Sequence, residues 1–256
     1  MKIETDPVLR QQAINALRDE YQMTTQRPGV HQSDLSYCLS KAYWNRVDPM
    51  PPTEHEVLLF AIGFGMERVL LSREETPAEI VVDGISLSLD TIKLFGPVDL
   101  KTTRMSPTKD KGCVVCGQPR SGHPGQSQGH KYEPDRGDFN MPEGWKRQFM
   151  AYRYGLNMTA PPTNEPQPVD YSFGAIVIHL IQPEVTAWQL TFTHNELVEN
   201  WNYLLERHSQ LDRMLAAQDP MPYQWNEDYE CNGCRFSLLC SLEASLKGTK
   251  TDAASR

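Results

Sequence analysis

The sequence has few cysteines, no excess of basic side chains and no long apolar run, and each absence excludes a class of protein. Six cysteines in 256 residues are too sparse for a secreted fold stapled by disulfides. The longest apolar run, residues 57–66, is too short to span a bilayer, and the polar N-terminus lacks the apolar stretch of a signal peptide. We therefore expect a cytoplasmic protein without a membrane partner, whose thiols are metal ligands or buried small side chains.

The acidic charge balance limits how the chain can bind nucleic acid. The formal net charge is −8, which argues against a protein coated in basic residues that holds DNA by bulk charge. A local basic groove around an acidic metal site remains compatible with this total.

The hydrophobic pattern predicts an α/β fold in a single domain over residues 1–256. Alternating apolar residues over 79–103 predict three strands of a β-meander with a tight turn at Asp83-Gly84, and 173–192 predict a hairpin. Residues 105–144 have no periodicity and are interpreted as an inserted loop. Together these elements indicate a small mixed sheet flanked by helices.

Helix starts are marked by capping residues. Predicted helices cover residues 7–22, 34–44, 54–72, 142–156 and 194–217. Ser33, Thr53 and Thr193 are the expected N-caps, and Glu56 completes a capping box with Thr53.

Two acidic residues and a lysine form the most informative pattern. Asp90 ends one predicted strand, and Asp99 and Lys101 point to the same face of the next. A short hairpin would place Asp90 beside Asp99, and two adjacent carboxylates repel unless a cation such as Mg²⁺ lies between them. A neighbouring lysine can then orient or deprotonate an attacking water. The alternative is a half-exposed strand with scattered charges.

The residues 95–103 around this pattern, Phe-Gly-Pro-Val-Asp-Leu-Lys-Thr-Thr, resemble the PD-(D/E)XK nuclease superfamily in its RecB-like branch. The resemblance implies a restriction-endonuclease-like core with Asp90 and Asp99 as Mg²⁺ or Mn²⁺ ligands and Lys101 as the catalytic lysine. Gln148 and Tyr152 match the branch's Q-x-x-x-Y helix motif, which contacts the substrate strand. Their spacing of four places both on one helical face, although a core tyrosine with a solvated glutamine would look the same.

The chain departs from this branch at one position. Where the branch carries a histidine metal ligand after a glycine, Glu67 stands four residues after Gly63. Glutamate is a good ligand for a hard cation, so Glu67 is a third candidate metal ligand. The alternative is an ordinary surface ion pair with Arg68 or Arg73.

Four cysteines near the ends of the chain form a second pattern. Cys231, Cys234 and Cys240 lie in the segment 228–247, and Cys38 is a candidate fourth ligand. This arrangement resembles the iron–sulfur nucleases of the RecB-like branch, including the CRISPR-associated ones, and implies a [4Fe–4S] cluster. Four thiolates also suit structural zinc. Closing this long loop would contribute on the order of 5 kcal/mol, so we expect a structural clip joining the N- and C-terminal segments.

The insertion contains a possible zinc site. Its cysteines and histidines have the spacing C-x2-C-x6-H-x6-H and are Cys113, Cys116, His123 and His130. A zinc-stabilised loop there, carrying several lysines and arginines, would help to hold a phosphate backbone. A loop with incidental cysteines explains the pattern equally well.

The sequence therefore indicates a divalent-metal-dependent DNA nuclease with an iron–sulfur clip. The resemblance implies an exonuclease acting on single-stranded DNA, with partner proteins from recombination, replication or CRISPR adaptation. The alternative is a non-catalytic DNA- or partner-binding subunit that keeps the nuclease fold, motivated by the missing histidine and the negative charge. Asp99 and Lys101 favour the enzyme, because a degenerate copy would be expected to have lost one of them.

Overall fold

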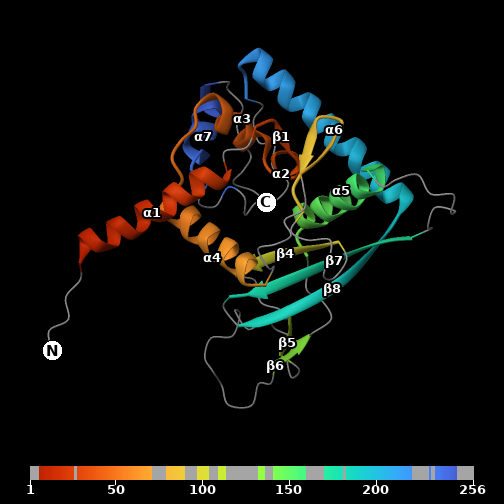
Figure 1. Cartoon of the computed structure of the whole chain (residues 1–256). Helices are drawn as coiled ribbons and strands as arrows, with labels where there is room; N and C mark the ends of the chain where they lie inside the picture. The colour runs from red at the N-terminus through yellow and green to blue at the C-terminus, as the bar shows by residue number, and fades with distance from the viewer. Residues whose placement is uncertain are drawn as a thin grey trace.

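The computed structural model shows an α/β protein in which two small mixed sheets are flanked by helices (Figure 1). It describes residues 6–25, 28–70, 79–89, 97–103, 109–113, 132–135, 141–159, 170–180, 183–220, 231 and 234–246. The strands are β1 (Val30–His31), β2 (Ile80–Val82), β3 (Ile85–Leu87), β4 (Val98–Thr103), β5 (Lys109–Cys113), β6 (Tyr132–Asp135), β7 (Asp170–His179) and β8 (Glu184–Thr193). The helices are α1 (Pro7–Thr25), α2 (Gln32–Ser36), α3 (Leu39–Val47), α4 (Glu54–Leu70), α5 (Glu143–Thr159), α6 (His194–Ala217) and α7 (Ser237–Leu246).

The sheet that carries the acidic motif has the order β4-β7-β8. β7 and β8 form the predicted antiparallel hairpin, which confirms that part of the sequence analysis. β4 pairs in parallel with β7, from Val98 opposite Gly174 to Thr103 opposite His179. Parallel pairing requires a long crossover, which here contains α5.

The predicted β-meander over 79–103 is wrong. β2 and β3 form the expected hairpin, and Asp83 and Gly84 both have positive φ, as a tight primed turn requires. β3 then pairs with β1 in the order β1-β3-β2, whereas β4 joins the other sheet. The hairpin expected to join the Asp90 strand to the Asp99 strand is therefore not formed between β3 and β4. Asp90 itself lies outside the described residues.

Two predicted helix caps are confirmed and one is wrong. Thr53 with Glu56, and Thr193 with Glu196, form reciprocal capping boxes at the starts of α4 and α6. Hydrogen bonds from Thr193 lower the pKa of the Glu196 carboxyl. Ser33 is not an N-cap, because α2 begins at Gln32.

None of the helices in the described part of the chain combines the length and apolarity that crossing a bilayer requires.

The helix expected over 34–44 is divided into two. α2 ends at Ser36, and α3 begins at Leu39 with Cys38 as its N-cap residue. The side chain of Arg207 on α6 is buried and donates hydrogen bonds to the carbonyls of Leu35 and Tyr37 at this break. A distant helix therefore satisfies carbonyls that a continuous helix would have used itself.

The core lies where α5 packs between the two sheets and α6 covers α5 (Figure 1). Phe149 on α5 stacks on Phe173 of β7 with ring centroids 5.4 Å apart. Tyr154 stacks on Trp201 of α6 at 4.7 Å, and the Trp201 indole donates to Asp83 Oδ2 at 2.9 Å. These contacts fix α5, and with it the face that carries Gln148.

The region 105–144 contains regular structure that the sequence did not reveal. β5 and β6 form an antiparallel ladder with a register shift between Asp110 and Cys113, and α5 already begins at Glu143. The interpretation of an entirely irregular insertion is therefore wrong for these segments. The ladder residues lack the apolar alternation from which strands are recognised, so backbone pairing alone defines them.

Two helical glycines provide a test of this packing. A Cβ at Gly155 of α5 would overlap with Leu87 Cδ1 on β3, whereas a Cβ at Gly65 of α4 has no described heavy atom within 4 Å. We expect Gly155→Ala to lower the free energy of unfolding by ~1–3 kcal/mol through overpacking. Gly65→Ala should raise it by ~0.5–1 kcal/mol, because alanine favours a helix interior. Urea unfolding measures both, and equal effects would contradict this packing.

Candidate active site

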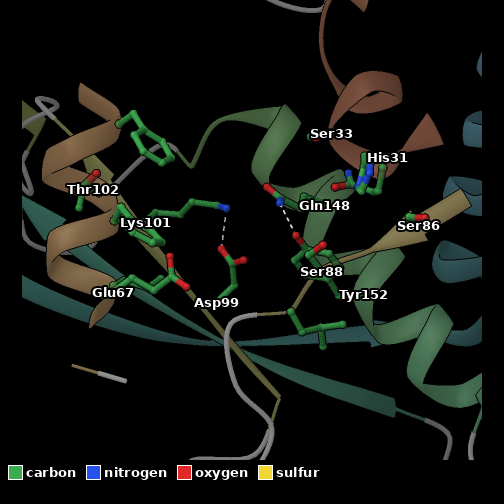
Figure 2. Close-up of a pocket in the computed structure, with 16 residues that line it drawn as sticks. His31, Ser33, Glu67, Ser86, Ser88, Asp99, Lys101, Thr102, Gln148 and Tyr152 are labelled. Carbon is green, nitrogen blue, oxygen red and sulfur yellow. Dashed lines mark hydrogen bonds and ion pairs between the residues drawn. The ribbon is translucent and has the colours of Figure 1, made fainter. Parts of the chain in front are cut away.

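A cavity of about 360 Å³ lies among α2, α4, β3, β4 and α5 (Figure 2). Its wall includes every predicted nuclease-site residue that the structure describes, namely Glu67, Asp99, Lys101, Gln148 and Tyr152. These residues come from three separate parts of the chain. Asp90 is outside the described residues, but Ser88 and Leu89, which lead to it, also line the cavity.

An ion pair on β4 is part of the cavity wall. Asp99 and Lys101 are two residues apart on one strand face, and Lys101 Nζ lies 2.6 Å from Asp99 Oδ2. Asp99 is 1 % exposed and the Lys101 side chain 17 %. Lys101 Nζ also lies 5.7 Å from the centroid of the Phe149 ring. A buried ion pair gains little net stability over an apolar pair, so its position in a cavity favours a chemical role.

Glu67 approaches the same space from α4. Figure 2 shows its carboxylate directed toward the region of Asp99 and Lys101. The helix comes close to β4 here, since a Cβ at Gly63 would lie 3.4 Å from Thr102 Oγ1. Arg68, one of the two alternative partners of Glu67, pairs with Glu20 at 3.1 Å. Two carboxylates therefore face one cavity beside an ammonium group.

Gln148 and Tyr152 occupy one face of α5, as their spacing predicts. Gln148 Nε2 donates to Tyr152 Oη at 2.5 Å, and the two residues are 8 % and 4 % exposed. Tyr152 also packs on Phe173, with ring centroids 6.1 Å apart. The pair therefore belongs both to the core and to the cavity wall, and the functional and structural interpretations of the motif are compatible.

Sequence reasoning missed several polar residues of the cavity. His31, Gln32 and Ser33 enter it from the start of α2, and Ser86 and Ser88 from β3 and the segment after it. His31 Nδ1 lies 3.4 Å from Glu79 Oε1. No motif spacing connects His31 with β4, so no signal in the sequence indicated it. Strand alternation could have identified Ser88, because it lies two residues before Asp90 and residues two apart share a strand face.

None of the four expected cluster ligands, Cys38, Cys231, Cys234 and Cys240, is in a disulfide bond. Burial raises the pKa of the Cys240 thiol to about 11, with further contributions from Cys38, Cys234 and Cys231, while Trp44 acts in the opposite direction. The thiols of the α3 N-terminus and of the C-terminal segment therefore lie in one region.

A hydrogen bond and a buried phenylalanine attach the C-terminal segment to the rest of the chain. Arg235 Nη2 donates to Asn45 Oδ1 on α3 at 3.0 Å, and Phe236 is fully buried. The turn is closed by a backbone hydrogen bond from Cys234 to Cys231.

The described residues include only some of the metal ligands predicted from the sequence. Among the described residues, no group of three or more His, Cys, Asp or Glu side chains has the arrangement to hold a metal ion. Of the suggested zinc ligands, Cys113 is the last residue of β5. Cys116, His123 and His130 lie outside the described residues.

Comparisons with known proteins add little to this geometry. No family model matches the chain, and no curated protein matches it. A solved structure titled "Crystal structure of SSO0001" aligns with a TM-score of 0.48 and 13 % sequence identity, over 92 % of this chain and 97 % of that chain. A likeness at this level carries no argument about fold family or activity, so functional inference depends on the residues themselves.

The ion pair makes a prediction about stability. Lys101→Met removes the ammonium group beside the buried Asp99 carboxylate and should lower the free energy of unfolding by about 3 kcal/mol. The double variant Asp99→Asn/Lys101→Met removes both charges and should recover most of that loss. Urea unfolding without added divalent metal measures both.

The control is the exposed pair of Arg213 with Glu206 on α6, at 3.0 Å. Arg213→Met should change stability by less than about 0.5 kcal/mol. A double variant as unstable as Lys101→Met would show that the charges of Asp99 and Lys101 are not coupled.

Proposed function

We propose that this protein is a divalent-metal-dependent deoxyribonuclease of the PD-(D/E)XK superfamily in its RecB-like branch, with a restriction-endonuclease-like core. The observation that supports the proposal is the Asp99–Lys101 pair inside a cavity whose wall also includes Glu67, Gln148 and Tyr152. If the charges on β4 were incidental, these residues from three parts of the chain would not be expected to line one cavity.

Asp99 and Glu67 would hold Mg²⁺ or Mn²⁺, together with Asp90. The two described carboxylates fit a hard cation, because they offer oxygen donors and face one space. When bound, the metal would polarise the phosphodiester and stabilise the leaving oxygen. Glu67 takes the place of the branch's histidine, and its harder ligand atom suits the same ions.

Lys101 would orient the attacking water and the phosphate. Its Nζ is held by Asp99 at 2.6 Å, which fixes the long side chain and keeps its charge inside the cavity. The Gln148 amide and the Tyr152 hydroxyl are joined at 2.5 Å and lie on the cavity wall. They would contact the substrate strand, with positions fixed by the core around α5.

The proposed substrate is single-stranded DNA degraded from an end, with partner proteins from recombination, replication or CRISPR adaptation. The test is digestion of end-labelled single- and double-stranded DNA with Mg²⁺ or Mn²⁺. Asp99→Asn and Lys101→Met should each lower the rate at least 100-fold, since each removes a group at the reacting phosphate.

Glu206→Gln on α6 is the matched control and should keep full activity, because Glu206 does not line the cavity and its side chain is mostly exposed. Activity that survives both Asp99→Asn and Lys101→Met would remove this mechanism. Metal-independent DNA binding without hydrolysis by the unmodified protein would instead support a non-catalytic binding subunit.

We further propose that Cys38, Cys231, Cys234 and Cys240 hold a [4Fe–4S] cluster that clips the C-terminal segment to α3. Four cysteines fit this group because sulfur is its only protein ligand, and the other three thiols contribute to the raised pKa of Cys240. Thiolates gathered without a cation repel one another, so binding of iron would draw the four sulfurs together.

The clip is tested by anaerobic purification with iron, sulfide and zinc analysis. Cys234→Ala should bleach the protein and lower its stability by on the order of 5 kcal/mol, because the loop from Cys38 is no longer closed. Cys113→Ala is the control: it should keep the iron and the colour, while losing any zinc that the 105–144 region binds. A stable and fully coloured Cys234→Ala protein would contradict the clip.

A further inference from the structure

A second cavity of about 1,140 Å³ adjoins the candidate active site. Its wall is formed by the end of α1, the segment 28–34, the segment 45–52 and Arg235 of the C-terminal segment. His31 and Ser33 line both this cavity and the active-site cavity. The start of α2 is therefore a wall that the two cavities share.

Aromatic rings continue from one cavity to the other. Tyr21 lines the second cavity, and its ring meets Phe60 edge-to-face with centroids 5.1 Å apart. Phe60 stacks on Phe64 at 5.4 Å, and both phenylalanines line the active-site cavity. Partly exposed rings beside a polar site provide surfaces on which unpaired bases pack, whatever their sequence.

Two guanidinium groups line the second cavity. Arg46 is bonded to Asp34 at 2.8 Å and keeps about a quarter of its side chain exposed. Arg235 is 8 % exposed; it donates to Asn45 and lies 3.8 Å from Glu56. Within the described part of the chain, its buried Nε has no hydrogen-bond acceptor. A guanidinium group that is held in place beside a cavity is suited to a phosphate oxygen.

We propose that the second cavity binds the part of a single DNA strand that extends away from the scissile bond. This inference rests on the proposed function for its substrate class. The sugar-phosphate backbone would run past His31 and Ser33 toward Arg46 and Arg235. Bases would pack against the ring of Tyr21 and the edge of the phenylalanine pair. A duplex keeps its bases stacked on each other and cannot use these surfaces, so the cavity favours a single strand.

Substitutions that change the charge of the exposed residue Met50 test whether a DNA strand follows this path through the second cavity. Met50 lines the second cavity and is 40 % exposed, whereas Val47 is 47 % exposed and does not line it. At low salt and without divalent metal, Met50→Glu should weaken binding of a fluorescein-labelled 12-nucleotide single strand about fivefold, and Met50→Lys should strengthen it by a similar factor. Val47→Glu and Val47→Lys should each change binding by less than about twofold.

A ring substitution tests the base contacts. Tyr21→Leu keeps apolar bulk but removes the ring, and should weaken binding of the ordinary 12-mer about fivefold. An abasic 12-mer should bind Tyr21→Leu and the unmodified protein alike. The charge effects at Met50 should be at least threefold smaller for a duplex of the same sequence than for the single strand.

Each outcome supports or overturns the path. The path is overturned if the Met50 variants bind the strand normally, or if Met50 and Val47 variants change its affinity equally. It is also overturned if the Met50 variants affect single strand and duplex equally, or if Tyr21→Leu weakens binding of the ordinary and abasic strands equally. If the unmodified protein hydrolyses DNA but the Met50 variants bind DNA normally, the path is overturned and the proposed nuclease activity is not. The expected binding pattern without any hydrolysis would overturn the proposed nuclease activity and leave the path standing.

Discussion

The parallel pairing of β4 with β7 is the constraint on which the candidate active site depends. It places Asp99 opposite Ala175 and Lys101 opposite Val177, two residues of the central strand β7. Because alternate residues of a strand share a face, the same register buries Asp99 and directs Lys101 to its carboxylate. A shift of one residue in the pairing of β4 would turn both charged side chains to the opposite face of the sheet, away from the cavity. Ala175 and Val177 are themselves buried, so the register is held by the core.

Short-range signals in the sequence predicted the features that depend on residues only a few positions apart. The capping boxes at Thr53 and Thr193 fix the starts of α4 and α6, because each depends only on residues three apart. The spacing of Asp99 with Lys101 and of Gln148 with Tyr152 correctly placed each pair on one face. The shared cavity confirms that these pairs lie together, although the chemistry assigned to them stays a prediction.

Long-range partners could not be predicted in the same way. β4 follows β3 in the chain but pairs with β7, and its own residues do not specify that choice. The break between α2 and α3 depends on Arg207, a residue of α6 that lies far away in the sequence. His31 reaches the cavity because β1 pairs with β3. In each case the deciding interaction joins segments that no local pattern connects, and the outcome depends on tertiary packing.

The crossover between β4 and β7 has a consequence for how the protein matures. On the ribosome, the strand bearing Asp99 and Lys101 emerges well before α5 and β7, and neither the parallel ladder nor the wall carrying Gln148 can form until those later segments have been synthesised. Closing such a long loop is entropically costly, so this sheet is expected to assemble late. A nascent or truncated chain that ends before α5 and β7 would carry Asp99 and Lys101 without the parallel partner strand and without the cavity wall that α5 supplies.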